Sequence, residues 1–170
     1  MASITTVPDK ATGDIFTESM WDSSIRDNIN NGIVTQLGCR VFSSANVATT
    51  STPAAISFNS ERFDNDTMHS SSTDPTRITI NTDGVYVIGG NVEWQGDSGR
   101  LQVNIKLNGS DFVGGQYQLG LSGSVVTRMV VTTMYNCVAG DYFELFVASQ
   151  NSVMINNTAF HSPEFWACRL

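Results

Sequence analysis

The stretch that decides the fold is Asp83-Gly84-Val85-Tyr86-Val87-Ile88-Gly89-Gly90-Asn91-Val92-Glu93-Trp94. It begins with an Asp-Gly turn and continues as a long run rich in β-branched and aromatic residues, which is typical of a β-strand. Over the first half of the run, apolar residues occupy both alternating faces, whereas a strand with one face in water alternates apolar and polar residues. The pattern predicts a central strand that is covered on both sides. One cover is the core of a β-sandwich, and the economical candidate for the other is a second copy of the chain.

The rest of the chain has the composition of a turn-rich β protein. Among its 170 residues there are 14 glycines, and only 15% of the residues are charged. The Asn108-Gly109 pair is the strongest hairpin signal. Short strand patterns recur without intervening helices, which predicts an all-β, antiparallel sandwich or jelly roll. The expected strands are Cys39–Ser44, Ala54–Phe58, Arg77–Asn81, Gly84–Trp94, Leu101–Leu107, Asp111–Leu119, Ser124–Tyr135, Tyr142–Val147 and Phe165–Leu170, with polar loops over 59–75 and 151–158.

Charge and cysteine usage exclude several classes of protein. The formal net charge of −7 argues against a nucleic-acid partner, because phosphates would be repelled. The sequence has no apolar run long enough for a transmembrane helix and no secretory signal pattern. Its three cysteines form no Cys-x-x-Cys pair, so we expect free thiols in a protein made in the cytoplasm.

Four stretches carry a resemblance to a known family when they are taken in order. They are Arg40-Val41-Phe42-Ser43, the central strand with its Val92-Glu93-Trp94 end, Gly140-Asp141-Tyr142-Phe143-Glu144-Leu145, and Phe165-Trp166-Ala167-Cys168-Arg169-Leu170. Over residues 39–170 this order resembles the tumour necrosis factor and complement globular-head superfamily. The resemblance implies a jelly roll that assembles into a compact homotrimer.

The resemblance also implies a place for individual side chains. It puts Tyr86, Ile88, Val92 and Trp94 in the core, and it puts the trimer interface at Val87, Gly89, Asn91, Trp166 and Cys168. The glycine pair 89–90 suggests a close approach of two backbones, so Gly89→Leu is expected to disturb assembly more than the monomer fold. Because the first and last strands are neighbours in this fold, Cys39 and Cys168 could lie close together.

Residues 1–36 differ from the jelly-roll region 37–170 that follows them. An extended arm reaches Gly13, and a short helix is expected after Thr17, with an apolar stripe formed by Trp21, Ile25 and Ile29. The run from Trp21 to Asn30 resembles N-terminal segments of tailed-phage structural proteins. A lone short helix is marginal in water. It packs on the flank of its own domain, docks on its trimer mates, or serves as an attachment segment on another protein.

An acidic cluster is the first candidate for site chemistry. The sequence Asp64-Asn65-Asp66 could donate oxygens to a cation, but it lacks the glycine and distal glutamate of an EF-hand loop. Turn residues that cap the loop backbone are the favoured interpretation. His69 and His161 have no metal-ligand spacing and are expected at the surface or at an interface.

Catalytic patterns are equally weak. Cys137 has no histidine near it in sequence, and the sequence around Ser122 does not fit a nucleophile elbow. Glu93 and Glu144 lie on separate predicted strands, and nothing in the sequence makes them converge. We therefore expect no catalytic residues, no cofactor, no metal and no enzymatic activity.

These features predict a structural protein of a bacteriophage virion. The leading hypothesis is a trimeric capsid decoration, or cement, protein that attaches through its N-terminal segment to the major capsid protein. The absence of coiled-coil and glycine repeats favours this compact role over a fibre shaft. The alternative is a tail, collar or fibre component that binds a protein or glycan on the host surface. The two polar loops contain only Phe63 as an aromatic residue, which argues against a carbohydrate-stacking site there.

Overall fold

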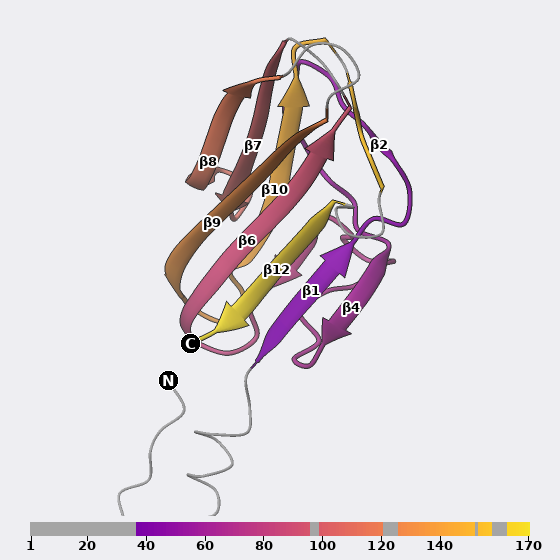
Figure 1. Ribbon diagram of the computed structural model, residues 1–170. Coiled ribbons are helices and arrows are strands. Elements are labelled where there is room, and N and C mark those ends of the chain that lie inside the picture. The colour runs from indigo at the N-terminus through magenta and orange to yellow at the C-terminus, as the bar shows by residue number, and fades with distance from the viewer. Residues whose placement is uncertain (1–36, 96–98, 121–125, 152, 158–162) are drawn as a thin grey trace, which may run out of the picture. The chain divides into compact units, whose positions relative to one another are not determined.

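The computed structural model describes residues 37–95, 99–120, 126–151, 153–157 and 163–170, all within one compact unit, Leu37–Leu170. The expected helix, with Trp21, Ile25 and Ile29, lies outside the described residues. The described residues form strands and loops, and no membrane-spanning helix is found among them. Two antiparallel sheets pack face to face, which confirms the predicted all-β sandwich (Figure 1).

We call the seven-stranded sheet A and the five-stranded sheet B. Sheet A contains β1 (Gly38–Phe42), β2 (Val47–Ala48), β4 (Ser60–Asp64), β6 (Gly84–Trp94), β9 (Thr127–Cys137), β11 (Met154–Ile155) and β12 (Glu164–Arg169). Sheet B contains β3 (Ala54–Ala55), β5 (Arg77–Thr79), β7 (Arg100–Leu107), β8 (Asp111–Leu119) and β10 (Tyr142–Ser149).

Strand β6 is central, as the sequence predicts. It pairs along its whole length with β9 on one side. On the other side it pairs with β12 from Tyr86 to Asn91, and β12 pairs in turn with β1. In sheet B, β7 lies between β8 and β10. The first and last strands of the described region are therefore neighbours, and the closing strand is held between two partners.

The core fills the space between the two sheets. Tyr86, Ile88, Val92 and Trp94 of β6 are at most 1% exposed, which confirms their expected positions. Sheet B supplies the opposite wall, with Leu101, Val103 and Ile105 from β7 and Phe143 and Leu145 from β10. Every second residue of these strands faces inward, so one face of each sheet is dry and the other is left for solvent or a partner.

The β7–β8 connection confirms the hairpin signal. Asn108 and Gly109 have φ angles of 50° and 76°, the left-handed pair that a tight hairpin turn requires. Within this hairpin the pairing shifts between Ile105 and Lys106, which marks a β-bulge in the ladder.

Several boundaries differ from the sequence prediction. Strand β4 lies inside the segment expected to be a loop, and the strand expected over 54–58 is reduced to Ala54–Ala55. The short strands β2 and β11 were also missed. Strand β4 is an edge strand whose residues are mostly polar and exposed, so its pairing is imposed by β1 rather than by an alternating pattern of its own.

Candidate assembly interface

The outer face of sheet A is the surface of each sheet A strand that points away from the core. Directly paired residues of antiparallel strands share a face. Val87 pairs with Met134 of β9 and with Cys168 of β12, and Gly89 pairs with Thr132 and Trp166. Asn91 pairs with Val130 and Glu164. The structure therefore brings all five residues expected at the threefold, Val87, Gly89, Asn91, Trp166 and Cys168, onto one face.

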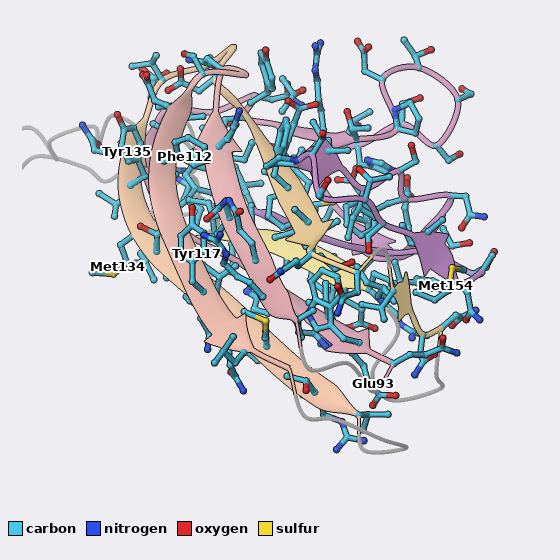
Figure 2. All side chains as sticks on the ribbon, turned by 90° about the horizontal axis from the view of Figure 1, so that it is seen from above. Glu93, Phe112, Tyr117, Met134, Tyr135 and Met154 are labelled. Carbon is cyan, nitrogen blue, oxygen red and sulfur yellow. The ribbon has the colours of Figure 1, made fainter. Side chains whose placement is uncertain are left out.

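Strand β9 adds two exposed apolar side chains to this face. Val130 is 58% exposed and pairs with Asn91, whereas Met134 is 66% exposed and pairs with Val87. Figure 2 shows Met134 projecting away from the sandwich. Sequence reasoning did not assign these two residues to the interface. The available signal was the apolar character of both faces of β9, where Met129 and Val131 already fill the core.

The two adjacent glycines make room for side chains of the same chain. A Cβ atom at Gly89 would lie 2.5 Å from Cζ2 of Trp166. The indole ring can therefore pack against β6 only because residue 89 has no side chain. Gly90 faces the core, where a Cβ atom would lie 2.7 Å from Cδ2 of Leu145. The close approach suggested by the glycine pair is therefore an internal one. Any part that Gly89 plays in assembly acts through Trp166.

A buried carboxylate marks one border of the outer face of sheet A. Glu164, 3% exposed, accepts hydrogen bonds from Arg40 Nε at 2.8 Å and from Arg62 Nη2 at 3.0 Å. The Arg40 guanidinium also lies 5.8 Å from the centre of the Trp166 ring, and that of Arg62 lies 4.1 Å from the Phe42 ring. These contacts fix the Trp166 side of the face in one arrangement.

A second charged group lies at the far end of β6. Glu93 accepts a hydrogen bond from Arg128 Nε at 2.7 Å and another from Asn156 Nδ2 at 3.2 Å. Between the two carboxylates, the buried Oδ1 atom of Asn91 finds no hydrogen-bond donor within the described part of the chain. An apolar centre with charged groups at its border is the usual composition of a protein–protein interface.

The acidic cluster has a structural role. Asp64 accepts hydrogen bonds from the backbone N–H groups of Asp66, Met68 and His69 at 3.2, 3.0 and 2.9 Å, which is the loop-capping role favoured from sequence. Burial, followed by the charge of Asp64, raises the pKa of Asp66. The described residues contain no group of three His, Cys, Asp or Glu side chains that could hold a metal ion.

One expectation about the histidines is wrong. His69 was expected at the surface or at an interface but is only 7% exposed. Its two ring nitrogens lie 2.9 Å from the carbonyl oxygen of Arg77 and 3.1 Å from that of Phe58. The ring joins two segments of the chain, so it is a structural residue. His161 lies outside the described residues.

The three cysteines all lie in the described residues and are free, as predicted. Cys39 pairs with Ala167 and faces the core, whereas Cys168 points to the outer face of sheet A, so the two thiols lie on opposite sides of the sheet. Burial raises the pKa of Cys137 to about 11 and, together with the charges of Asp64 and Glu61, also raises that of Cys39. The buried thiols are thus held in their neutral, inert form.

The two glutamates considered for acid–base chemistry do not converge. Glu93 belongs to the outer face of sheet A, where Arg128 holds it. Glu144 lies on the outward face of sheet B, where it accepts a hydrogen bond from Thr76 Oγ1 at 2.6 Å. The two sheets and the core separate the carboxylates, so the pair cannot act on one bond.

Comparison with known proteins identifies the fold. No family model matches the chain, and no curated protein matches it by sequence. Among solved structures, murine APRIL at pH 5.0 superposes with a TM-score of 0.64 at 5% identity, covering 80% of this chain and 100% of that one. The globular domain of zebrafish complement 1qA protein gives a TM-score of 0.58 at 11% identity, covering 80% and 98%. The chain therefore has the jelly-roll fold of tumour necrosis factor family and complement C1q globular domains.

Proposed function

We propose that this chain is a homotrimeric structural protein in which the outer face of sheet A is buried between copies. The observation that carries the proposal is that three apolar side chains of this face, Val85, Val130 and Met134, are each at least 40% exposed in the single chain. Full burial of such a side chain is worth about 1.5–3 kcal/mol. Three such side chains on the outer face of one sheet favour a protein partner over solvent.

Two further observations support a partner of the same kind. Domains of this fold typically form homotrimers. In addition, Asn91 offers a buried acceptor for which the described residues provide no donor, and a neighbouring copy can supply one. In the proposed assembly, Val87, Gly89, Asn91, Trp166 and Cys168 lie near the threefold axis, together with Val130 and Met134.

Sedimentation equilibrium tests the assembly. At micromolar concentration we expect a species of about three times the mass of the 18.4 kDa chain. A stable single chain at that concentration would contradict the proposal, and so would a dimer.

The role we propose for this trimer is that of a bacteriophage capsid decoration protein, made in the host cytoplasm and carried on the virion. The support comes from the N-terminal segment. The run from Trp21 to Asn30, which carries the Trp21, Ile25 and Ile29 stripe, resembles the N-terminal segments of tailed-phage structural proteins, and the described strands after residue 37 form both sheets of the sandwich. An attachment segment that becomes ordered on the major capsid protein suits addition to a finished particle.

A truncation that begins at Gly38 tests the attachment. The truncated chain is expected to fold and form trimers, yet to be absent from particles assembled without the native protein; the full-length chain added in parallel is the control. Decoration by the truncated chain at the full-length level would rule out attachment through residues 1–36. Imaging of purified particles labelled at this protein then separates a head position from a tail position.

A further inference from the structure

A pocket lies on the opposite side of the sandwich, on the outer face of sheet B. This face is the surface of the sheet B strands that points away from the core. The pocket has a volume of about 370 Å³ and is lined by Asn104 of β7 and by Phe112, Val113, Gly114, Gly115 and Tyr117 of β8. Figure 2 shows Phe112 and Tyr117 along β8. A volume of this size lies within the range of small-molecule sites.

The floor of the pocket contains a buried amide that the fold leaves unsatisfied. Asn104 is 2% exposed, and its Nδ2 donor has no hydrogen-bond partner among the described residues. Asn104 pairs with Gly115, where any Cβ atom would overlap with Oδ1 of the amide. Because buried donors are nearly always bonded, a bare glycine opposite an unbonded amide indicates a place for an acceptor from outside the chain.

The walls of the pocket are two aromatic rings brought onto one face by the β-bulge. Residues of β8 alternate between the two faces of sheet B, and Tyr117 and Gly115 lie on the outer face. Without a bulge, the same alternation would place Phe112 on the inner face. The register shift between Ile105 and Lys106 pairs Lys106 with Phe112, and it turns the Phe112 ring to the outer face of sheet B. Phe112 and Tyr117 are 60% and 61% exposed. The bulge therefore creates an aromatic pair separated by the glycine gap.

The charged group nearest to the pocket is already engaged. Nζ of Lys106 lies 4.8 Å from the centre of the Phe112 ring and 4.2 Å from that of Phe146. This ammonium group fixes the Phe112 wall rather than offering an isolated positive charge. The net charge of −7 also disfavours an anionic ligand. The pocket chemistry is thus suited to a neutral molecule with an apolar face and an acceptor oxygen.

We propose that this pocket binds a neutral saccharide ring. The polarised C–H bonds on one face of a pyranose would stack on the negative faces of the Tyr117 and Phe112 rings. A half-turn of the Asn104 amide would bring Nδ2 to the Gly115 gap, where a ring hydroxyl oxygen would accept the hydrogen bond that this donor does not make within the described chain. The site is complete in a single chain, so this proposal does not rest on the trimer. The sequence prediction found no stacking site because it considered the aromatic residues of the loops, whereas this pair lies on a strand.

Nuclear magnetic resonance of the full chain, isotope-labelled at glycine nitrogens, tests the proposal. The ligands are the methyl glycosides of glucose, galactose, mannose and N-acetylglucosamine at millimolar concentration. At least one is expected to shift the Gly114 and Gly115 amide signals saturably, while Gly89 and Gly140 stay unchanged. Tyr117→Ala and Phe112→Ala should each weaken binding about tenfold. Leu119→Ala removes an apolar side chain of β8 that is 70% exposed and lies outside the pocket, and binding by this control should stay within about twofold of wild type.

Two results would overturn the proposal. The first is the absence of saturable shifts at Gly114 and Gly115 with all of these glycosides. The second is binding by Tyr117→Ala and Phe112→Ala that equals wild type. If the amides do not shift and Tyr117→Ala also lowers the mass of the assembly, the pocket is covered by another copy of the chain and is not a saccharide site.

Discussion

The outer faces of the two sheets differ in how their apolar side chains are distributed. On sheet A, the exposed Met134 lies in line with Val87 and Cys168, and the exposed Val130 lies in line with Asn91 and the buried Glu164. On sheet B, charges lie among the rings: Arg77 is 4.2 Å from the centre of the Tyr142 ring, and Lys106 lies between two phenylalanines. A broad apolar face suits a second protein, whereas a gap between two rings with an unbonded amide suits a small ligand.

The largest effect on assembly is expected when a positive charge is placed on the outer face of sheet A. The same charge on the outer face of sheet B should have no such effect. Met134→Lys would bury an unpaired ammonium group in the proposed interface, which costs about 3 kcal/mol or more. The trimer dissociation constant should therefore rise more than a hundredfold. Sedimentation across a concentration series measures it.

The matched control for that variant is Leu119→Lys, on the outer face of sheet B. Leu119 is 70% exposed, compared with 66% for Met134. Assembly of this control should be unchanged. Equal weakening of assembly by both variants would mean that the two faces do not differ in the way proposed.

The next prediction compares alanine substitutions at the two adjacent glycines of β6. Gly90→Ala places a methyl group against Leu145 in the core and should lower the free energy of unfolding by about 2 kcal/mol. Gly89→Ala displaces the partly exposed Trp166 ring, so its larger effect should be on assembly. Chemical denaturation and sedimentation of both variants measure the two quantities. The same loss of monomer stability in both would contradict the assignment of Gly89 to the outer face of sheet A.

A smaller effect compares the carboxylates of the two faces. Glu164→Gln removes the charge held by Arg40 and Arg62 and should cost about 1.5 kcal/mol, because both arginines are partly exposed. Glu144→Gln, whose arginine nitrogen lies 3.7 Å away, should cost less. Denaturant midpoints rank the two variants, and the reverse order would mean that the Glu164 contacts do not stabilise their face.

The smallest effect concerns a thiol between the sheets. Because burial raises the pKa of Cys137 from 9.0 to about 11, its contribution to stability is complete below pH 9 and is lost as the pH rises. Between about pH 9 and pH 10 this thiol alone should lower the free energy of unfolding by about 1 kcal/mol. Urea denaturation of wild type and Cys137→Ala at both pH values measures the contribution of this thiol to the pH dependence of stability. An identical pH dependence of the two proteins would show that the thiol is not held neutral.

Local patterns in the sequence predicted the framework of the fold. The central strand and the Asn108-Gly109 hairpin were found because their signals lie within a few adjacent residues. Strand β4 was missed because edge pairing with β1 requires no apolar alternation. Val130, Met134, Phe112 and Asn104 could not be grouped in advance, because their positions depend on the register between strands and on a bulge. Interstrand register is non-local information that a single sequence does not display.

Alkylation of Cys168 tests most directly whether the outer face of sheet A is covered by other copies. This thiol belongs to the face, pairs with Gly38 and Val87, and is partly exposed in the single chain. Mass spectrometry after brief maleimide treatment at micromolar concentration would follow its modification in native wild type and in Met134→Lys. We predict that Cys168 is protected in wild type and modified rapidly in the dissociated variant, with all three cysteines modified after denaturation. Equally rapid modification of Cys168 in native wild type would contradict the proposed interface.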